Sequence, residues 1–479
     1  MKYRACRIAI YYTLVLLTVR FSLACGSVGN VSQEAPPPNA VIVAQKGGGQ
    51  YKSIGEALRA VQPGMRILVR PGLYRENLII DKPVEIVADS RGTTESVSIQ
   101  TLNSSSITMR TERAVVRGFT IRHRVGFMGG LFNLLSKNQT PAVDVPQGEL
   151  VLEHCDIVSN SVAGIAIHGT NANPVIRNTK IHDGKSNGVW VYDGAQGTLE
   201  DCDISGTYWS GVRIEEGGNP ILRRCKVSKS KQAGIVVTDG GLGRIEDCEI
   251  FDNYLGLESR SGSKPTVLRT NIHHSKHNGV YVQESSSALI EECQIHSNGN
   301  VGLQILEHSS PIVTRSRIFD NVYSDVEISG GSDPIIRDCA IYGGGMSGLF
   351  VYNGGLGTIE NCDIFGHSNY QEVAISGGNP MLRNCKIHKG KMGGVLFLEN
   401  AAGTLEDCDI HENGYSGVWI RTGSKPTIRN TKINNNDGVA VLAEQNTAGS
   451  VMDCNLTGNS VGPWNVEVGS QLKRSRNIE

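Results

Sequence analysis

Short aliphatic runs recur along the chain at a fixed interval and predict stacked copies of one structural unit. An aliphatic residue closes the motif typified by "CDI" at fourteen positions, and eleven of the thirteen intervals are 23 residues long. The other two intervals are 24 and 22 residues. So regular a period is typical of a repeat architecture. The marker positions are Ile157, Ile181, Ile204, Val227, Ile250, Ile272, Ile295, Ile318, Ile341, Ile364, Ile387, Ile410, Ile433 and Leu456.

Each repeat contains three short runs with the composition of β-strands. One is typified by "GVWV" at residues 188–191, another by "PILR" or "GTLE", and the third begins at the marker. These runs are too short, and too rich in Val and Ile, to be helices. Three strands per 23 residues, always in the same order, predict one coil of a parallel β-helix. Fourteen coils at about 4.8 Å each would extend for about 65 Å.

The parts of the chain outside the regular repeats differ in pattern. We divide the sequence into a signal peptide (1–25), a flexible tether (26–39), an N-terminal cap with irregular coils (40–150), regular repeats (151–470) and a polar tail (471–479). Ser53 and Glu56 form a capping box, and the apolar spacing that follows predicts an amphipathic helix that covers the open first coil. Residues 126–140 break the repeat and are expected to pack over a face or to lid a groove.

The N-terminal segment indicates export. Residues 8–19 form an apolar stretch that is short for a membrane span of about 20 residues but suits a signal peptide. Ser22, Leu23 and Ala24 precede Cys25 in a pattern that resembles a bacterial lipoprotein cleavage site, so Cys25 is a candidate for lipidation. Plain secretion, with Cys25 incidental, is the alternative. Either way we expect the protein in the periplasm, in the cell envelope or outside the cell, with membrane contact only through this segment.

Ten of the twelve cysteines share one column, two residues before the marker, where Thr and Ser fill the other positions. Members such as Cys202, Cys225 and Cys248 are expected to form an inward ladder at a turn. Stacked side chains hold their Cβ atoms about 4.8 Å apart, which is wider than the ~3.8 Å mean of a disulfide. The absence of CxxC pairs argues against a zinc site. We therefore predict buried, reduced thiols and no metal site.

Basic and acidic residues alternate from coil to coil in two columns. Four residues before the marker, Arg177, Glu200, Arg223 and Glu246 follow one another. In-register stacking would place like charges over each other, so alternation converts repulsion into attraction worth about 0.2–1 kcal/mol per pair. Histidines directly after the marker recur in the same way, and we interpret them as structural as well. This column includes His182, His273, His296, His388 and His411.

The overall charge and composition restrict the classes of partner. A formal net charge of −1 over 479 residues gives no reason to expect a nucleic-acid partner. Aromatic residues make up only 6% of the chain. Six of them nevertheless fall at outward positions of the strand after the turn glycine, namely Trp190, Tyr192, Tyr281, Phe350, Tyr352 and Trp419.

The repeats resemble the right-handed parallel β-helix superfamily typified by pectate lyases. Residues 173–204, "NPVIRNTKIHDGKSNGVWVYDGAQGTLEDCDI", are similar to repeats of F-box-only proteins and of bacterial carbohydrate-binding or sugar-hydrolase-type β-helices. Residues 50–78 are similar to the start of pectin-methylesterase-like chains. The resemblance spans residues 41–468. It implies a right-handed β-helix whose substrate groove is the strand face that carries the six aromatic residues.

Recognisable catalytic motifs of that superfamily are missing from the sequence. The NTD, paired-Asp, GHG and RIK motifs of polygalacturonases and the DPHD motif of alginate epimerases do not occur. Asp363 matches the pectin-esterase Asp motif superficially, but it shares a column with Asp203 and Asp409. An Arg–Glu cluster could supply a base and neutralise a uronate, so the candidate catalytic residues are Arg213, Glu215, Glu258 and Glu327. Solvated strand charges are the alternative interpretation of these four.

Two classes of function remain open. The first is a non-catalytic rod that binds a polysaccharide or a protein partner along the groove, where exposed rings would stack on sugars. The second is a polysaccharide lyase, a C5-epimerase or a pectin-esterase-like enzyme with an unrecognised site. The six aromatic residues could instead stabilise the sheet or seat residues 126–140. The missing motifs favour the first class, and no cofactor is predicted.

Overall fold

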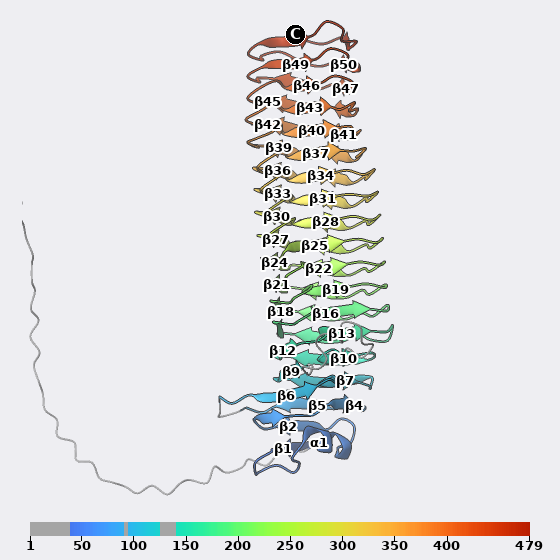
Figure 1. The fold of residues 1–479 in the computed structure, drawn as a ribbon, viewed down its shortest axis with the longest axis vertical. Helices are drawn as coiled ribbons and strands as arrows, with labels where there is room; N and C mark the ends of the chain where they lie inside the picture. The colour runs from blue at the N-terminus through green and yellow to red at the C-terminus, as the bar shows by residue number, and fades with distance from the viewer. Residues whose placement is uncertain (1–38, 91–93, 125–139) are drawn as a thin grey trace, which may run out of the picture.

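The computed structural model describes residues 39–90, 94–124 and 140–479, and these residues form a parallel β-helix (Figure 1). Three parallel sheets, here called A, B and C, run along the stack with 19, 16 and 17 strands. A regular coil contributes one strand to each sheet in the order A, B, C. The predicted all-β solenoid is therefore confirmed. The predicted signal peptide, Cys25 and nearly all of residues 126–140 lie outside the described residues.

Neighbouring coils stack in register. One coil consists of β14 (Val175–Arg177), β15 (Lys180–His182) and β16 (Asn187–Tyr192), and the next of β17 (Thr198–Glu200), β18 (Asp203–Ser205) and β19 (Val212–Ile214). Ile176 pairs with Leu199, Ile181 with Ile204 and Val189 with Val212, and all six side chains are at most 1% exposed. Each aliphatic column thus forms a continuous strip of the core.

Sheet C carries the predicted groove face. Its strands are β4 (Leu78–Ile80), β7 (Ile107–Met109), β10 (Val143–Val145), β13 (Ala163–His168), β16, β19, β22 (Ala233–Val237), β25 (Leu255–Ser259), β28 (Val280–Val282), β31 (Leu303–Ile305), β34 (Val326–Ile328), β37 (Leu349–Tyr352), β40 (Val373–Ser376), β43 (Val395–Leu398), β46 (Val418–Ile420), β49 (Val439–Ala443) and β51 (Gly462–Val466).

The two ends of the stack differ from its middle. Near the N-terminal end, α1 (Ile54–Ala60) lies between β1 (Ala40–Val43) and β2 (Arg66–Val69), and the Ser53 side chain accepts a hydrogen bond from the Glu56 backbone N–H at 3.1 Å. That the helix caps the first coil stays a prediction. At the other end, the predicted polar tail contains β52 (Lys473–Ser475), which pairs with β50 (Ser450–Met452). Within the described ranges, no helix is long and apolar enough to cross a bilayer.

The cysteine column is an internal file of free thiols, as predicted. The ten cysteines of the column are free and buried, with exposures of 1–3%. Cys225 Sγ donates to the carbonyls of Leu199 and Arg223, each at 3.4 Å. Burial raises the pKa of Cys293 to about 12, so its reactive thiolate is scarce near neutral pH. The residue before each column cysteine takes a left-handed conformation, for example Asp201 with φ of 53° and Asn361 with φ of 56°.

Four of the five predicted histidines belong to a longer ladder of rings on the outer face of sheet B. The fifth, His182, lies outside it, with its Nε2 atom 3.2 Å from Asp156 Oδ1. Adjacent centroids lie 4.6–5.5 Å apart with interplanar angles of 5–10°. Each inner ring therefore has both faces covered by its neighbours, which supports a structural role. The sequence interpretation identified the histidines but not the rings between them. The ladder consists of Phe251, His273, His296, Phe319, Tyr342, Phe365, His388 and His411.

The alternating charges of sheet A pair across coils. Arg177 Nε lies 3.1 Å from Glu200 Oε2, and Arg223 Nη2 lies 2.5 Å from Glu246 Oε1. Glu200 is held from three sides, because Arg223 and Arg224 also approach it. The predicted charge ladder is therefore confirmed as a set of inter-coil ion pairs.

The buried thiol file predicts a two-step reaction with a thiol reagent. In the folded protein, the ten column cysteines should resist Ellman's reagent, because burial excludes the reagent and disfavours the thiolate. After unfolding in guanidinium chloride, all ten should react. Absorbance of the released chromophore measures both steps. Rapid modification of column thiols in the folded protein, located by peptide mass spectrometry, would contradict the assignment.

Reversing one charge of the ladder should weaken the stack. Glu200→Arg turns the two cross-strand pairs with Arg177 and Arg223 from attraction into repulsion. At about 0.2–1 kcal/mol per pair, we expect the free energy of unfolding to fall by roughly 1–2 kcal/mol. Urea titration followed by circular dichroism measures it. The matched control Glu200→Gln removes the attraction alone and should lose about half as much, and equal effects would contradict the ladder.

Candidate functional site

The outer face of sheet C presents the outward column in which the candidates were predicted. Inward neighbours such as Val189 and Val191 are completely buried, so the predicted alternation holds. The outward side chains are, however, less exposed than the sequence suggested. Val236 is 4% exposed and Leu396 is 2% exposed. The reason is that each side chain is covered by equivalents only about 4.8 Å away in the neighbouring coils. The column runs through Trp190, Arg213, Val236, Glu258, Tyr281, Gln304, Glu327, Phe350, Ala374, Leu396 and Trp419.

The four candidate catalytic residues do not form one site. Arg213 and Glu215 belong to the coil of β19, whereas Glu258 lies in β25, two coils further on. Glu327 lies in β34, another three coils away. At about 4.8 Å per coil, Glu327 stands roughly 24 Å from Arg213. A base and a charge-neutralising group must reach the same reacting atoms, so these residues cannot act together.

The Arg213–Glu215 pair is engaged in local structure. Arg213 Nε donates to Glu215 Oε2 at 2.6 Å, and Trp190 Nε1 donates to Glu215 Oε1 at 2.7 Å. Glu215 is only 7% exposed. Both carboxylate oxygens therefore have a donor from the protein. This arrangement is typical of a buried structural carboxylate rather than of a free base.

The other two candidate carboxylates also have polar neighbours. Glu258 Oε1 accepts from Gln283 Nε2 at 3.1 Å, and Glu327 Oε2 accepts from Gln304 Nε2 at 3.0 Å. Burial raises the pKa of Glu327 above the ordinary value of a glutamate. Glu258 and Glu327 are three coils apart, so neither assists the other.

The six predicted ring residues occupy four separate places on sheet C. Trp190 and Tyr192 stack at 4.3 Å in β16, Tyr281 follows four coils later, Phe350 and Tyr352 stack at 4.7 Å in β37, and Trp419 lies in β46. Steps of three or four coils correspond to about 14–19 Å. The rings therefore do not form one continuous platform. All six are half-buried.

Neighbouring groups further define the separate ring positions. His168 stacks on Tyr192 at 5.0 Å, and burial raises the pKa of Tyr192 to about 12. Burial likewise raises the pKa of Tyr281. Trp419 Nε1 donates to Glu444 Oε1 at 3.2 Å, and the Arg421 guanidinium lies 5.3 Å from the Trp419 ring. These rings are thus integrated into local contacts of the sheet.

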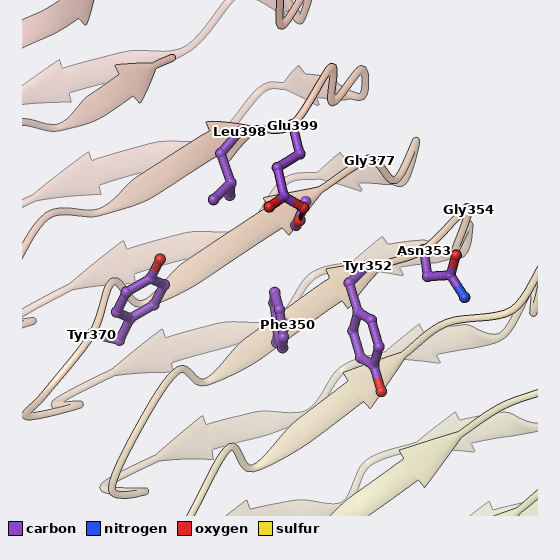
Figure 2. Close-up of a pocket in the computed structure, with 9 residues that line it drawn as sticks. Phe350, Tyr352, Asn353, Gly354, Tyr370, Gly377, Leu398 and Glu399 are labelled. Atoms are coloured by element: carbon purple, nitrogen blue, oxygen red, sulfur yellow. Dashed lines mark hydrogen bonds between the residues drawn. The ribbon is translucent and has the colours of Figure 1, made fainter. Parts of the chain in front are cut away.

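One ring pair borders a pocket of about 550 Å³ (Figure 2). Figure 2 shows Phe350 between Tyr370 and Tyr352, with Leu398 at the end of β43, two strands away, and Glu399 directly after it. The pocket combines three aromatic rings with hydroxyl, amide and carboxylate groups at its edge. The lining residues are Phe350, Tyr352, Asn353, Gly354, Tyr370, Ser376, Gly377, Leu398 and Glu399.

The pocket exists because one coil departs from its neighbours. In register with Phe350 and Tyr352, β40 presents Ala374 and Ser376, and the next strand presents Leu396 and Leu398. Small side chains between two rows of large ones leave a hollow. The loop before β40 is one residue longer than usual. Val373, the first inward residue of β40, comes nine positions after the marker Ile364, whereas the equivalent residue follows the marker by eight positions in most coils. This loop carries Tyr370.

Sequence reasoning identified Phe350 and Tyr352 but missed Tyr370, Ser376 and Glu399 at the pocket. A signal was present in the lengthened loop, where Glu372 also replaces the glycine that occupies the equivalent position in most regular coils. Across the described parts of the chain, no group of three or more His, Cys, Asp or Glu side chains is arranged to hold a metal ion.

Comparison with known proteins places the fold in a family. The family model described as "Right handed beta helix region" matches residues 133–268, 242–377 and 326–478. These matches cover more than half of the chain, so the chain belongs to this family.

Solved structures with a similar course of the chain include three polysaccharide-modifying enzymes. The periplasmic alginate epimerase AlgG shares 10% identity over 85% of this chain and 78% of its own, with a TM-score of 0.37. The A-module of the Azotobacter vinelandii mannuronan C-5 epimerase AlgE6 shares 12% over 88% and 92%, with a TM-score of 0.36. The Aspergillus niger pectin methylesterase shares 13% over 56% and 87%, with a TM-score of 0.33. These similarities are weak, and no activity follows from them.

Removing Glu215 should expose its structural role. Glu215→Ala leaves the Arg213 guanidinium and the Trp190 indole N–H without their acceptor, and we expect a loss of about 1–3 kcal/mol in unfolding free energy. Urea unfolding followed by tryptophan emission measures it. The double variant Arg213→Ala/Glu215→Ala should lose less than the sum of the two single variants. Strict additivity would contradict the direct pairing.

Proposed function

We propose that the outer face of sheet C binds a carbohydrate chain without modifying it, and that the pocket at Phe350, Tyr352 and Tyr370 is the principal contact. The observation that carries this proposal is the hollow lined by three aromatic rings and edged by Asn353 and Glu399. Sugars present apolar C–H faces and hydroxyl edges. Aromatic rings suit the faces, and amide, hydroxyl and carboxylate groups suit the edges.

The charge of the pocket favours a neutral sugar over a uronate. Glu399 is the charged residue among those that line the pocket, and no Lys, Arg or His lines it. An acidic sugar would meet this carboxylate without a compensating cation, which costs binding energy. Arg213, the residue predicted to neutralise a uronate, lies in β19, six coils from Phe350. The proposed ligand is therefore a neutral polysaccharide.

A binding role is also more consistent with the carboxylates than a catalytic one. Acid–base chemistry on a glycoside needs two groups in reach of one bond. The first and last of the four candidate residues are five coils apart, and each of the three carboxylates accepts a hydrogen bond from a protein side chain. The repeating coil height, about 4.8 Å, is close to the length of one sugar residue, so a chain could lie along the stack.

We further propose that the protein acts after export, with Cys25 as the lipidation site. The support comes from the sequence of residues 1–25 alone, where basic, apolar and small-residue segments follow one another as in a signal peptide. Cell fractionation combined with mass spectrometry of the mature N-terminus tests this point. A mature chain that retains residues 1–24 would exclude it.

Loss of the pocket rings should weaken carbohydrate binding. A glycan array should yield neutral oligosaccharides as ligands, and calorimetry of a hit should show binding about ten-fold or more weaker for Phe350→Ala/Tyr352→Ala. Two rings, each worth about 0.5–1.5 kcal/mol beyond burial, account for that factor. The matched control Phe319→Ala/Tyr342→Ala removes two rings from sheet B and should bind like wild type.

Further variants decide how much of the face takes part. Alanine at all six predicted rings should bind no tighter than the Phe350/Tyr352 double variant. If the six-ring variant binds every hit as well as wild type, or if the sheet B control loses binding equally, the proposed function is wrong. Preferential binding of uronate chains would overturn the assignment of substrate class.

A further inference from the structure

A buried cluster of three ionisable side chains joins the two ends of the loop that carries Tyr370. Two of its members flank Tyr370 in the loop, and the third comes from the chain directly before β34. Asp325, His367 and Glu372 are 0% exposed. His367 Nε2 lies 2.9 Å from Asp325 Oδ2, and His367 Nδ1 contacts Glu372 Oε2. Both ring nitrogens face carboxylates, so the ring is held as an imidazolium that donates to both.

The remaining carboxylate oxygens are also satisfied. Asn321 Nδ2 donates to Asp325 Oδ1 at 2.7 Å, and the Gly344 backbone N–H donates to Asp325 Oδ2 at 3.2 Å. The His367 backbone N–H donates to Glu372 Oε1 at 2.8 Å. Among the described residues, the charged groups that face His367 are these two carboxylates. Ions survive burial only when they are paired and hydrogen-bonded in this way.

The cluster interrupts a ladder of buried asparagines. In most coils from β25 onward, an Asn stands three residues after the marker, and a Gly stands directly before the sheet C strand. A Cβ atom at Gly302 would lie 2.5 Å from Asn321 Nδ2, and one at Gly279 would lie 2.6 Å from Asn298 Nδ2, so these Asn side chains pack against the Gly of the preceding coil. Asn413 Nδ2 donates to Asn436 Oδ1 at 2.9 Å along the same ladder. Its members are Asn253, Asn298, Asn321, Asn413, Asn436 and Asn459.

On either side of His367, a glycine occupies the position of the Asn and an acidic residue occupies the position of the Gly. Glycines 344 and 390 occupy Asn positions, and Asp325 and Glu372 occupy Gly positions. A Cβ atom at Gly344 would lie 2.8 Å from Asp325 Oδ2, and one at Gly390 would lie 2.6 Å from Glu372 Oε1. The carboxylates thus fill the room that asparagines fill elsewhere. Because neutral Asn–Gly pairs satisfy the same space in other coils, the fold does not require the charges.

We propose that Asp325, His367 and Glu372 are positioning residues that fix Tyr370 over the pocket and release it when the imidazolium loses its proton. His367 and Glu372 bracket Tyr370 within six residues, so one ring anchors both ends of the loop. A neutral ring has a single N–H. One carboxylate would then remain buried without its donor, which favours opening of the loop. The inference rests on the proposed function only for its effect on ligand binding.

The direction of the pH dependence follows from the environment of the cluster. Burial alone lowers the pKa of His367, but the hydrogen bonds with Asp325 and Glu372 outweigh burial and raise the pKa to about 9. The unfolded value is about 6.5. The stabilisation is therefore complete below about pH 6.5 and is lost as the pH rises through about 9.

A five-site variant tests the proposal, because it restores the regular ladder while keeping Tyr370 and the lengthened loop. It combines Asp325→Gly, Gly344→Asn, His367→Asn, Glu372→Gly and Gly390→Asn. The new Asn side chains fit, since the nearest atoms at both glycines belong to the acids that are removed. The measured quantity is the amide hydrogen exchange rate of residues 366–372 divided by that of the regular loop 412–417. The ratio cancels the intrinsic effect of pH on exchange.

In wild type, this exchange ratio should rise about ten-fold once the pH exceeds a pKa near 9 by one unit. Affinity for a neutral glycan should fall over the same range. The five-site variant should show a flat ratio and a flat affinity. A flat ratio in wild type, or an equal rise in the variant, would overturn the inference. If wild type binds no glycan at any pH but the ratio rises, the proposed function fails and the positioning device stands.

A measurement on wild type alone covers the case in which the variant does not fold. Histidine ring carbon signals, followed by NMR from about pH 6 to pH 10, should include one that titrates near 9 and disappears in His367→Asn. Absence of any histidine signal that titrates above about pH 8 would overturn the inference.

Discussion

In-register parallel stacking is the constraint on which the rest of the structure depends. Each residue stands about 4.8 Å from its equivalents in the coils on either side, so every position must be compatible with copies of itself. Apolar, thiol, amide and ring side chains satisfy this condition by forming ladders. Charges do not, and sheet A therefore alternates Arg with Glu, as between Arg177 and Glu200. Backbone hydrogen bonds between strands hold the stack together, but the contacts within each column determine which side chains a position can accommodate.

The features that repeat could be predicted from the sequence because each column leaves a trace every 23 residues. The file of Cys202, Cys225 and Cys248 was visible in this way. The ring ladder of sheet B was harder to recognise. Histidine, phenylalanine and tyrosine share one column there, and their common property is planarity rather than identity or charge. Whether a strand side chain faces the core or the outer surface was also predictable. The degree of exposure of Val236 or Leu396 was not, because it depends on the side chains of neighbouring coils.

The candidate site was predicted only in part because it arises where the repeat is broken. Phe350 and Tyr352 followed from alternation, whereas Tyr370 enters the pocket through one additional loop residue. The hollow itself results from Ala374 and Ser376, which are unremarkable in the sequence. The predicted catalytic residues were correctly placed on one face, yet Glu327 and Arg213 are separated along the axis. A linear pattern identifies the column of a residue, but convergence on one point requires departures from that pattern.

The thiol file has a consequence for how the chain matures. In a solenoid each coil contacts only its neighbours, so folding can start at one place and proceed coil by coil. Every newly docked coil then covers the sulfur of the coil beneath it, so the thiols of docked coils are closed to an oxidant while the rest of the chain is still folding. Growth from a nucleus would in this way shorten the time for which each cysteine can form a disulfide. An unfolded chain, in contrast, exposes the whole row of cysteines at once.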